Sequence, residues 1–420
     1  MPSFSFVHTA DLHLDSPFSA FNLNHPDIAA AMRAATMEAF DKVVQLCLEK
    51  EVDFLLVAGD VYDGADRGLR AQVKFRDGLK SLHEAGIRSF VVHGNHDPLN
   101  GWSSTLDWPE RVHIFRDDVE TVRVERDGLV LACVQGISYR DRDEKRNLSL
   151  LFRRTDSAFH IGLLHANVGS DTGHEPYAPC TSEDLRRGEM DYWALGHVHQ
   201  RSVLSKERPW VVYPGNTQGR NIRETGEKGC YLVKVGEDKS VETEFHATDV
   251  LRWVRKEVSI RNVQTEQELL STLDKVCQDI SGSTSGRPAI ARICLTGRGP
   301  LYRSLIREGA QADLLELLQE TGMSYTPYVW IEQVQLDLKP ELELNTLRRG
   351  QGFIGEMLLC SKELAESHHF EEQMQRELSS LFQDPRVRRF VDMPNMEALK
   401  NLLGKAEGLC VDSLLTEEEV

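Results

Sequence analysis

The sequence lacks long hydrophobic runs and paired-cysteine motifs, and both absences limit what the protein can be. None of its apolar stretches approaches the roughly 20 residues that a helix needs to cross a bilayer, so we expect no membrane span. Its 8 cysteines are scattered singly, with no CxxC pair, which favours reduced core thiols and a cytoplasmic setting. The N-terminus has no basic region followed by an apolar one, so we expect no signal peptide.

A surplus of basic residues is also missing. The formal net charge is −17 at pH 7, which argues against a protein that coats nucleic acid along its length. A nuclease is still compatible with this charge, because metal ions and local arginine clusters can handle phosphates within an acidic protein. The net charge therefore does not identify the class of partner, which must be inferred from sequence motifs.

The first part of the chain predicts an α/β sandwich. Over residues 1–246, short strand-like runs alternate with helical stretches. Apolar residues at helical spacing predict helices at 28–48 and 69–85, the second ended by Gly86. Further strands are expected at 209–213 and 229–235.

The rest of the chain predicts two smaller parts, which agrees with a length of 420 residues being too great for one typical domain. Residues 250–340 have a β-α-β-α-β pattern, predicting a small α+β domain closed by Pro340. Residues 341–420 predict amphipathic helices, with a break at Asp384-Pro385.

Five apolar runs end in polar residues that can bind metal. The runs are 4–7, 54–58, 90–92, 161–164 and 192–195. The polar blocks near their ends are Asp11-Leu12-His13, Gly59-Asp60-Val61-Tyr62-Asp63, Gly94-Asn95-His96-Asp97, Leu164-His165 and Gly196-His197-Val198-His199. Open α/β folds place their sites at the carboxyl ends of buried strands, so we expect these blocks to meet.

Seven side chains in these blocks are candidate metal ligands: Asp11, His13, Asp60, Asn95, His165, His197 and His199. Carboxylates, imidazoles and one amide oxygen suit a pair of Mn, Fe or Zn ions, and do not suit a structural zinc. Two ions about 3.5–4 Å apart clamp a phosphoryl group for in-line attack. The leaving oxygen then needs an acid, for which His96 is the candidate, with Asp63 expected to orient it.

Each block alone has an ordinary explanation. A lone Asp-x-His such as Asp11-Leu12-His13 is common by chance, and Asn and Gly at 94–95 are ordinary turn residues. Chance is a poor explanation for five blocks in order, separated by strand-helix units. His8, His25, His83, His113, His174, His246, His368 and His369 lack such a context, and we interpret them as surface or packing residues. His93 is close to the blocks, but its place inside a strand favours a core role.

The five blocks resemble, element by element, the signature of the calcineurin-like metallophosphoesterases. Within that superfamily the chain looks like the DNA double-strand-break repair nucleases of the SbcD type, and is most similar to their bacterial YhaO-like branch. The more specific strings are His8-Thr9-Ala10-Asp11-Leu12-His13-Leu14-Asp15 and Asp191-Tyr192-Trp193-Ala194-Leu195-Gly196-His197-Val198-His199. The resemblance is strong over residues 1–235 and weaker beyond. It implies a sandwich of two packed sheets flanked by helices, followed by a capping domain and by helices that dock on an SMC-like ATPase.

The resemblance also implies roles for individual residues. One ion would be held by Asp11, His13, Asp60 and His199, and the other by Asp60, Asn95, His165 and His197. Manganese is the metal that the family usually prefers, with Fe, Zn or Mg as alternatives, and His96 would be the catalytic histidine. Asp63 departs from the family's pattern, since eukaryotic and archaeal members often carry His there. Protein phosphatases pair His with Asp in Gly-Asp-x-x-Asp-Arg-Gly, but here Asp66-Arg67-Gly68 comes three residues late.

Basic residues in loops near the metal edge are candidate phosphate contacts: Arg67, Arg140, Arg142, Arg220 and Arg223. For any single one, a solvated surface role is the ordinary interpretation. In the C-terminal part, an apolar stripe from Phe353 to Leu358 predicts either an ATPase-docking surface or packing on the chain's own capping domain.

The leading prediction is a two-metal, Mn-dependent DNA phosphodiesterase, an exonuclease that works in double-strand-break repair with an SbcC-type coiled-coil ATPase. A homodimer is implied by the resemblance alone. One alternative is a phosphoesterase of the same fold acting on nucleotides, cyclic nucleotides or another small phosphodiester, which competition by long duplex DNA would distinguish. A second alternative is a scaffold that keeps the fold without catalysis, which metal content would test.

Overall fold

The computed structural model describes residues 1–16, 25–64, 67–101, 106–169, 175–339, 347, 352–382 and 394–414. The described residues form two compact units. The first comprises 1–256, 272–294 and 312–335, and the second 257–271, 295–311 and 336–420. The predicted division at 246–250 and 340 therefore stays a prediction. Pro340 and Asp384-Pro385 lie outside the described residues.

One of the two large sheets in the first unit has six strands in the order β12-β11-β1-β2-β3-β4. Their bounds are β1 Phe4–Thr9, β2 Phe54–Ala58, β3 Arg88–Val92, β4 Val112–Ile114, β11 Gly229–Val235 and β12 Val241–Ala247. Neighbours from β1 to β4 are parallel, whereas β11 is antiparallel to both β1 and β12. The carboxyl ends of β1, β2 and β3 therefore lie at one edge.

The other six-stranded sheet has the order β5-β6-β7-β8-β10-β9. Its strands are β5 Glu120–Arg126, β6 Leu129–Ile137, β7 Phe159–His165, β8 Tyr192–Gly196, β9 Ser202–Ser205 and β10 Trp210–Tyr213. The central pairs β6-β7, β7-β8 and β8-β10 are parallel. Parallel strands that are buried on both faces have nearly continuous apolar sequences. This is why β7 and β8 could be predicted from the sequence.

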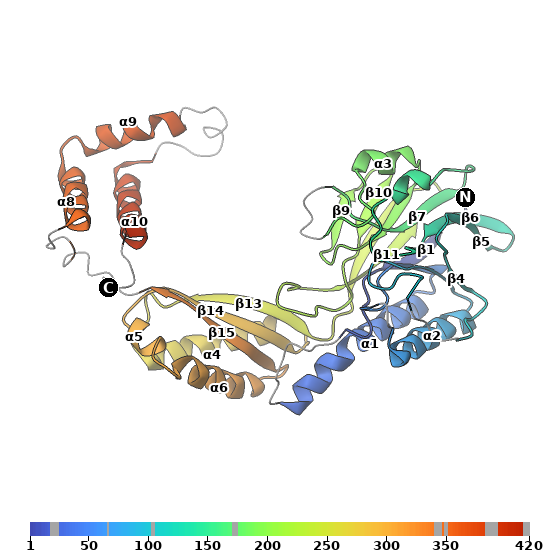
Figure 1. Ribbon diagram of the computed structural model, residues 1–420, viewed down its shortest axis with the longest axis horizontal. Helices are drawn as coiled ribbons and strands as arrows, with labels where there is room; N and C mark the ends of the chain where they lie inside the picture. Colours follow the sequence, from blue (N-terminus) through green and yellow to red (C-terminus); the bar gives the residue numbers. More distant parts are fainter. Residues whose placement is uncertain are drawn as a thin grey trace. The chain divides into compact units, whose positions relative to one another are not determined.

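The two sheets pack face to face with helices on their outer sides (Figure 1). Between the sheets, the ring of Phe6 stacks on Phe54 at 5.0 Å and meets Tyr192 of the other sheet edge-on at 5.3 Å. Helices α1 (Pro26–Glu49) and α2 (Leu69–Glu84) pack on the outer face of the first sheet, with Phe40 and Phe75 in the shared core. The short elements η1 (Leu148–Leu151) and α3 (Ser182–Arg187) pack on the other outer face against Trp193. This is the predicted α/β sandwich.

The remaining elements follow residue 250. They are β13 Arg252–Ser259, α4 Glu266–Ser283, β14 Ala289–Arg298, α5 Tyr302–Leu305, α6 Ala310–Met323, β15 Val329–Lys339, α8 Phe353–Glu366, α9 Phe370–Phe382 and α10 Met396–Leu414. Strands β13, β14 and β15 form a three-stranded sheet in that order. Within the first unit, Trp253, Ile290 and Trp330 pack against Ile28 and Met32 of α1.

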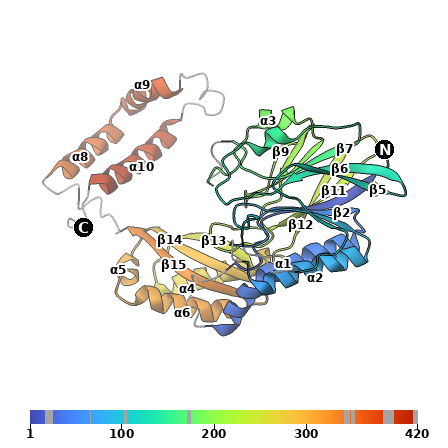
Figure 2. The same ribbon diagram turned by 45° about the vertical axis from the view of Figure 1, so that its right-hand side comes forward.

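Most predicted elements are confirmed, with differences at their ends. The predicted β-α-β-α-β pattern has one helix before its last strand, whereas the structure has two there, α5 and α6, and Gly309 between them has a positive φ of 83°. Helices α8, α9 and α10 contact one another, with α8 beside α10 in Figure 2.

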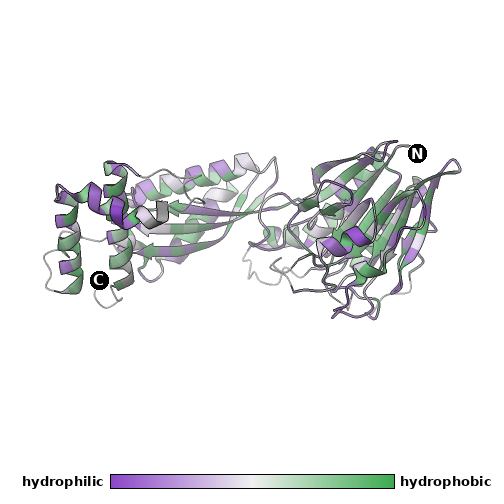
Figure 3. Ribbon diagram, turned by 90° about the horizontal axis from the view of Figure 1, so that it is seen from above, coloured by the Kyte–Doolittle hydropathy of each residue, from purple (hydrophilic) through white to green (hydrophobic). Residues whose placement is uncertain are grey.

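Hydrophobic residues concentrate in the strands of the two large sheets (Figure 3). Among the described residues, none of the helices is both long enough and apolar enough to cross a membrane. Of the predicted apolar stripe, Leu358 is fully buried whereas Phe353 is 71% exposed. The docking role of this stripe stays a prediction.

Candidate metal centre

The five predicted blocks lie together at the carboxyl ends of β1, β2, β3, β7 and β8. Four of the seven predicted ligands have a left-handed backbone, with φ of 52° at Asp11, 45° at His13, 49° at Asp60 and 98° at His197. Such conformations are uncommon for residues other than glycine, and they cluster where a fold must hold side chains in place.

Main-chain hydrogen bonds fix the first two blocks against each other. The amides of Asp11 and His13 donate to the main-chain oxygens of Gly59 (3.0 Å) and Asp60 (3.1 Å). The amide of His197 donates to the carboxylate of Asp11 at 3.1 Å, which ties the second sheet to the first. The loops are therefore ordered by the protein itself.

The ligand atoms of these blocks form overlapping groups. Asp11, His13 and His199 make one group and Asp11, Asp60 and His165 another, with the atoms of each group within 4.8 Å of one another. Asn95 joins the second group, because its Oδ1 lies 3.0 Å from Nε2 of His165. The two groups share Asp11, and Oδ2 of Asp60 lies 3.4 Å from Nε2 of His165 in one group and 3.9 Å from Nε2 of His13 in the other. Two such adjacent groups can hold two ions.

Hydrogen bonds to the far side of three imidazole rings indicate which nitrogen faces the centre. Nδ1 of His165 donates to the main-chain oxygen of Ala58 (3.0 Å), so its Nε2 carries the lone pair. Nε2 of His197 donates to the main-chain oxygen of Glu175 (2.9 Å), so its Nδ1 carries the lone pair. Nδ1 of His199 donates to Oε1 of Glu224 at 2.7 Å.

The arrangement of His13 and His199 fits a metal ion. Their Nε2 atoms lie 3.3 Å apart. Nδ1 of His13 lies 2.8 Å from Oδ1 of Asp63, without the alignment of a hydrogen bond, and a carboxylate at that distance favours a proton on Nδ1. Both Nε2 atoms then carry lone pairs, which repel at this distance unless a proton or a cation lies between them.

Burial shifts the titration of these groups toward their neutral forms. It lowers the pKa of His165 to about 4 and lowers the pKa values of His13 and His199 as well. Burial also raises the pKa of Asp60 to about 6 and, together with the charge of Asp60, raises that of Asp11 well above its usual value. The imidazoles are thus ready to bind a cation at neutral pH, and a cation would relieve the buried carboxylates.

His96 lies at the opening of the group, with its side chain 31% exposed. Its amide donates to Oδ1 of Asp60 (3.0 Å), and its Nδ1 donates to the main-chain oxygen of Asp63 (3.0 Å). The carboxylate of Asp63 is farther away, with Oδ1 at 3.8 Å from Nδ1. Asp63 therefore holds His96 mainly through its main chain, whereas we expected its side chain to do so.

The Asp63 carboxylate is engaged by other groups. It pairs with the guanidinium of Arg220 and accepts a hydrogen bond from Ser16 Oγ (3.1 Å). Its own amide donates to Oδ1 of Asp15 at 2.7 Å. Asp63 thus links the first block to the loop that carries Arg220.

The five predicted DNA-contacting arginines fall into two groups. Arg140, Arg142 and Arg223 are exposed. Arg67 is only 7% exposed and donates to the main-chain oxygens of Asp97 (2.7 Å) and Pro98 (2.8 Å), so its position supports a structural role. The Arg220 side chain is 14% exposed and is engaged by Asp63.

Glu224 and Glu175 are residues of this centre that the sequence analysis missed. Glu224 contacts His199 although it belongs to no block, and nothing in the local sequence marks it. Burial acts to raise the pKa of Glu224, but the hydrogen bond from His199 and the charge of Arg220 outweigh it and hold that pKa well below its usual value. The Glu224 carboxylate is therefore ionised.

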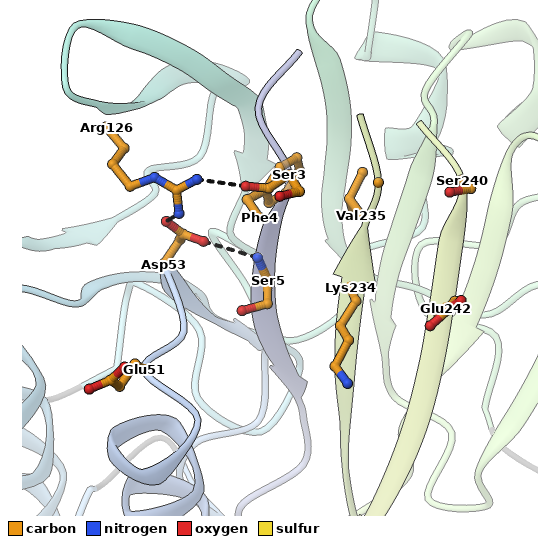
Figure 4. A pocket seen from close by; sticks show the side chains of 11 residues that line it. Ser3, Phe4, Ser5, Glu51, Asp53, Arg126, Lys234, Val235, Ser240 and Glu242 are labelled. Carbon is orange, nitrogen blue, oxygen red and sulfur yellow. Dashed lines mark hydrogen bonds and ion pairs between the residues drawn. The ribbon is translucent and has the colours of Figure 1, made fainter. Parts of the chain in front are cut away.

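A separate cleft of about 460 Å³ lies at the other ends of the strands (Figure 4). Its lining includes Ser5 in β1 and Asp53 just before β2, whereas the metal ligands follow the carboxyl ends of these strands. Arg126 pairs with Asp53 at 2.7 Å and donates to the main-chain oxygen of Ser3 at 2.6 Å. These contacts tie down the start of β1, and the cleft is not part of the metal centre.

Comparison with known proteins places this geometry in a family. The family model for calcineurin-like phosphoesterases matches residues 4–201, and the model for the middle domain of the metallophosphoesterase YhaO matches residues 253–339. The chain belongs to the calcineurin-like metallophosphoesterases. It is 38% identical over 345 residues to the uncharacterized metallophosphoesterase YhaO of Bacillus subtilis, covering 81% of this chain and 83% of that protein.

More distant relatives are DNA double-strand break repair proteins named Mre11. That of Haloferax volcanii is 26% identical over 55% of this chain, and that of Methanocaldococcus jannaschii is 24% identical over 64%. The chain spans about half the length of the Haloferax protein (49%) and 73% of the Methanocaldococcus protein. The solved structure of a dimetal phosphatase from Danio rerio aligns with 59% of this chain and all of that one, at 13% identity and a TM-score of 0.35.

Proposed function

We propose that the protein is a two-metal DNA phosphodiesterase, an exonuclease that acts in double-strand-break repair. The observation that carries the phosphodiesterase assignment is the buried group of carboxylates, imidazoles and one amide at the sheet edge, with His96 at its opening. The choice of DNA is supported by the distant relatives that are named repair proteins and by the exposed arginines in nearby loops. Manganese is the proposed metal, since this mixed ligand set suits it.

The chemistry would be shared between the ions and the protein. When bound, two divalent ions supply Lewis-acid catalysis, neutralising phosphoryl charge and making water a stronger acid. Asp11, His13, Asp60 and His199 would hold one ion, and Asp60, Asn95, His165 and His197 the other. The chain's own contribution is a rigid set of ligands whose burial excludes bulk water and strengthens each charge interaction.

His96 would serve as the proton donor for the leaving oxygen. Its Nδ1 is held by the main-chain oxygen of Asp63, so its Nε2 is the atom available for proton exchange. A positioned general acid of this kind typically contributes about 10²–10⁴-fold to a rate. His96 needs no metal contact for this role, which separates it from its neighbour Asn95.

DNA would be held through its backbone. Arg140 and Arg142 follow β6, and Arg223 lies in the loop between β10 and β11, so all three belong to loops of the first unit. Arginines at such positions bind phosphates without reading the bases. An SMC-like coiled-coil ATPase is the proposed partner, and the exposed Phe353 of α8 is one candidate contact for it.

The test is cleavage of an end-labelled linear duplex by the purified protein with Mn²⁺, Mg²⁺ or a chelator, beside His96→Ala. We expect Mn-dependent shortening from an end, lost in His96→Ala even though the variant still binds metal. Hydrolysis of bis-p-nitrophenyl phosphate without DNA cleavage, and without inhibition by long duplex DNA, would instead support a small phosphodiester as substrate. Cleavage by His96→Ala at the wild-type rate would contradict the role given to His96.

A further inference from the structure

The imidazoles of the metal centre differ in what holds their outer nitrogen. His165 and His197 donate to main-chain oxygens, of Ala58 and Glu175. His199 instead donates to a carboxylate, that of Glu224, at 2.7 Å. Nδ1 of the fourth imidazole, His13, lies 2.8 Å from the carboxylate of Asp63. The two sides of the centre are therefore not equivalent, since carboxylates lie behind His13 and His199 whereas neutral main-chain oxygens lie behind His165 and His197.

Glu224 is held independently of His199. Its Oε2 accepts hydrogen bonds from Nδ2 of Asn216 (2.9 Å) and from the amide of Arg220 (2.7 Å). The side chain of Glu224 is only 10% exposed. The surrounding loop is fixed by Trp253, whose Nε1 donates to the main-chain oxygen of Gly219 at 2.9 Å. The carboxylate is thus held by groups of the protein other than His199.

Arg220 connects this loop to the first block. Its guanidinium pairs with the carboxylate of Asp63 and lies 3.6 Å from Oε1 of Glu224. Asp63 in turn lies 2.8 Å from Nδ1 of His13. Asp63, Arg220 and Glu224 therefore form a charged chain behind His13 and His199, the two rings whose Nε2 atoms face each other.

The chemistry of Glu224 determines the tautomer of His199. An ionised carboxylate only accepts hydrogen bonds, so Nδ1 of a neutral His199 must carry the proton and Nε2 must present its lone pair toward Asp11 and His13. A carboxylate behind a metal-binding imidazole also increases its basicity, and losing such a partner typically weakens metal binding about 10–100-fold. A main-chain carbonyl fixes the tautomer without adding charge.

We propose that Glu224 is a positioning residue for the metal ligand His199, and that the ion on the Asp11, His13 and His199 side is consequently bound more tightly than the ion on the His165 and His197 side. This inference rests on the metal centre of the proposed function and is independent of DNA as the substrate. It predicts two unequal binding steps for the metal-free protein.

The test is calorimetric titration of the metal-free protein with Mn²⁺, without any DNA, for wild type and Glu224→Gln. The two Glu224 oxygens accept hydrogen bonds from His199, Asn216 and the amide of Arg220. A Gln side chain has only one oxygen, so its NH₂ group must face one of these donors and lose that hydrogen bond. We expect the tighter step to weaken about 10–100-fold and the weaker step to change by less than about 3-fold. Unchanged binding in both steps, or equal weakening of both, would overturn the proposal.

Two controls separate positioning from general damage. Glu227→Gln makes the same change at a nearby glutamate whose side chain is 42% exposed, and it should leave both steps unchanged. Cys133→Ser removes a ligand from a separate group, Cys133, Asp156 and His160, so that an ion bound there is not counted. Both controls should keep two unequal steps.

A second variant and a spectroscopic readout cover the case in which Glu224→Gln does not fold. Asn216→Ala removes one support of Glu224 and should weaken the same step by a smaller factor, about 3–10-fold. In ¹⁵N-histidine-labelled metal-free protein, NMR should show the proton of neutral His199 on Nδ1 in wild type. In Asn216→Ala, a larger fraction of His199 should carry the proton on Nε2. A tautomer that stays on Nδ1, with wild-type affinity, would overturn the proposal whether or not the protein cleaves DNA.

Discussion

A Cβ atom on Gly196 would lie 1.8 Å from the main-chain oxygen of Ala58. Gly196 ends β8 in one large sheet and Ala58 ends β2 in the other, so the main chains of the two sheets come close together beside the metal ligands that follow. The same oxygen accepts the hydrogen bond from His165. The sandwich and the centre are therefore coupled at this point.

Gly196→Ala is expected to destabilise the protein by about 3 kcal/mol or more, at or above the upper end of the range for overpacking, because main-chain atoms must separate. Urea denaturation of the metal-free protein measures this. Gly282→Ala is the matched control, since an added Cβ there meets no atom within 4 Å and the residue lies in α4. Gly282→Ala should leave the free energy of unfolding unchanged or raise it by up to about 1 kcal/mol. Equal midpoints for the two variants would contradict the close approach.

Asp60→Ala is expected to lose both metal binding and turnover, because the Asp60 carboxylate lies between the two groups of ligands. Its Oδ2 is 3.4 Å from Nε2 of His165 and 3.9 Å from Nε2 of His13. Metal analysis of the dialysed variant, beside His96→Ala as a metal-retaining comparison, measures the loss. Two bound equivalents of metal in Asp60→Ala would show that Asp60 does not bridge.

Metal binding at mildly acidic pH is expected to displace protons from carboxyl groups. Burial raises the pKa of Asp60 to about 6 and raises that of Asp11 well above its usual value, whereas it lowers the pKa of His165 to about 4. As pH falls through about 6, the carboxyl groups take up protons first, and affinity for the cation should fall with them. Infrared difference spectra on adding Mn²⁺ at pH 5.5 should show protonated carboxyl absorption disappearing. Signals from imidazolium alone would contradict this order of titration.

The arginines are expected to separate into surface and structural classes. Arg140→Ala and Arg223→Ala should each weaken DNA binding at all sequences and reduce the slope of log affinity against log salt by about 1. Arg67→Ala should instead lower the free energy of unfolding by about 2 kcal/mol, because it removes the buried guanidinium that donates to the main-chain oxygens of Asp97 and Pro98. Salt titrations of DNA binding and urea denaturation, applied to all three variants, make the comparison. A reduced salt slope for Arg67→Ala without loss of stability would reverse the assignment.

Some of the fold escaped the sequence analysis although a local signal was present. The β5-β6 hairpin was not predicted, yet its turn is Asp127-Gly128, with φ of 54° and 74°. Asp-Gly is a strong signal for a two-residue hairpin turn of this kind. The alternating polar and apolar residues of β5 (Glu120–Arg126) also indicate a strand with one solvated face.

The apolar runs and polar blocks of the sequence were enough to predict the sandwich and its candidate ligands. Buried parallel strands have almost continuously apolar sequences, and the ligands follow directly at their ends. Residues adjacent in the sequence were therefore enough to predict both the strands and the ligands. The residues that support the ligands, in contrast, come from contacts between distant parts of the chain. Glu224 reaches His199 across 25 positions, Arg220 reaches Asp63 across 157, and Arg67 is buried beneath a loop 30 residues away. Such pairings depend on how loops from separate strands close over one edge, and no local pattern encodes that closure.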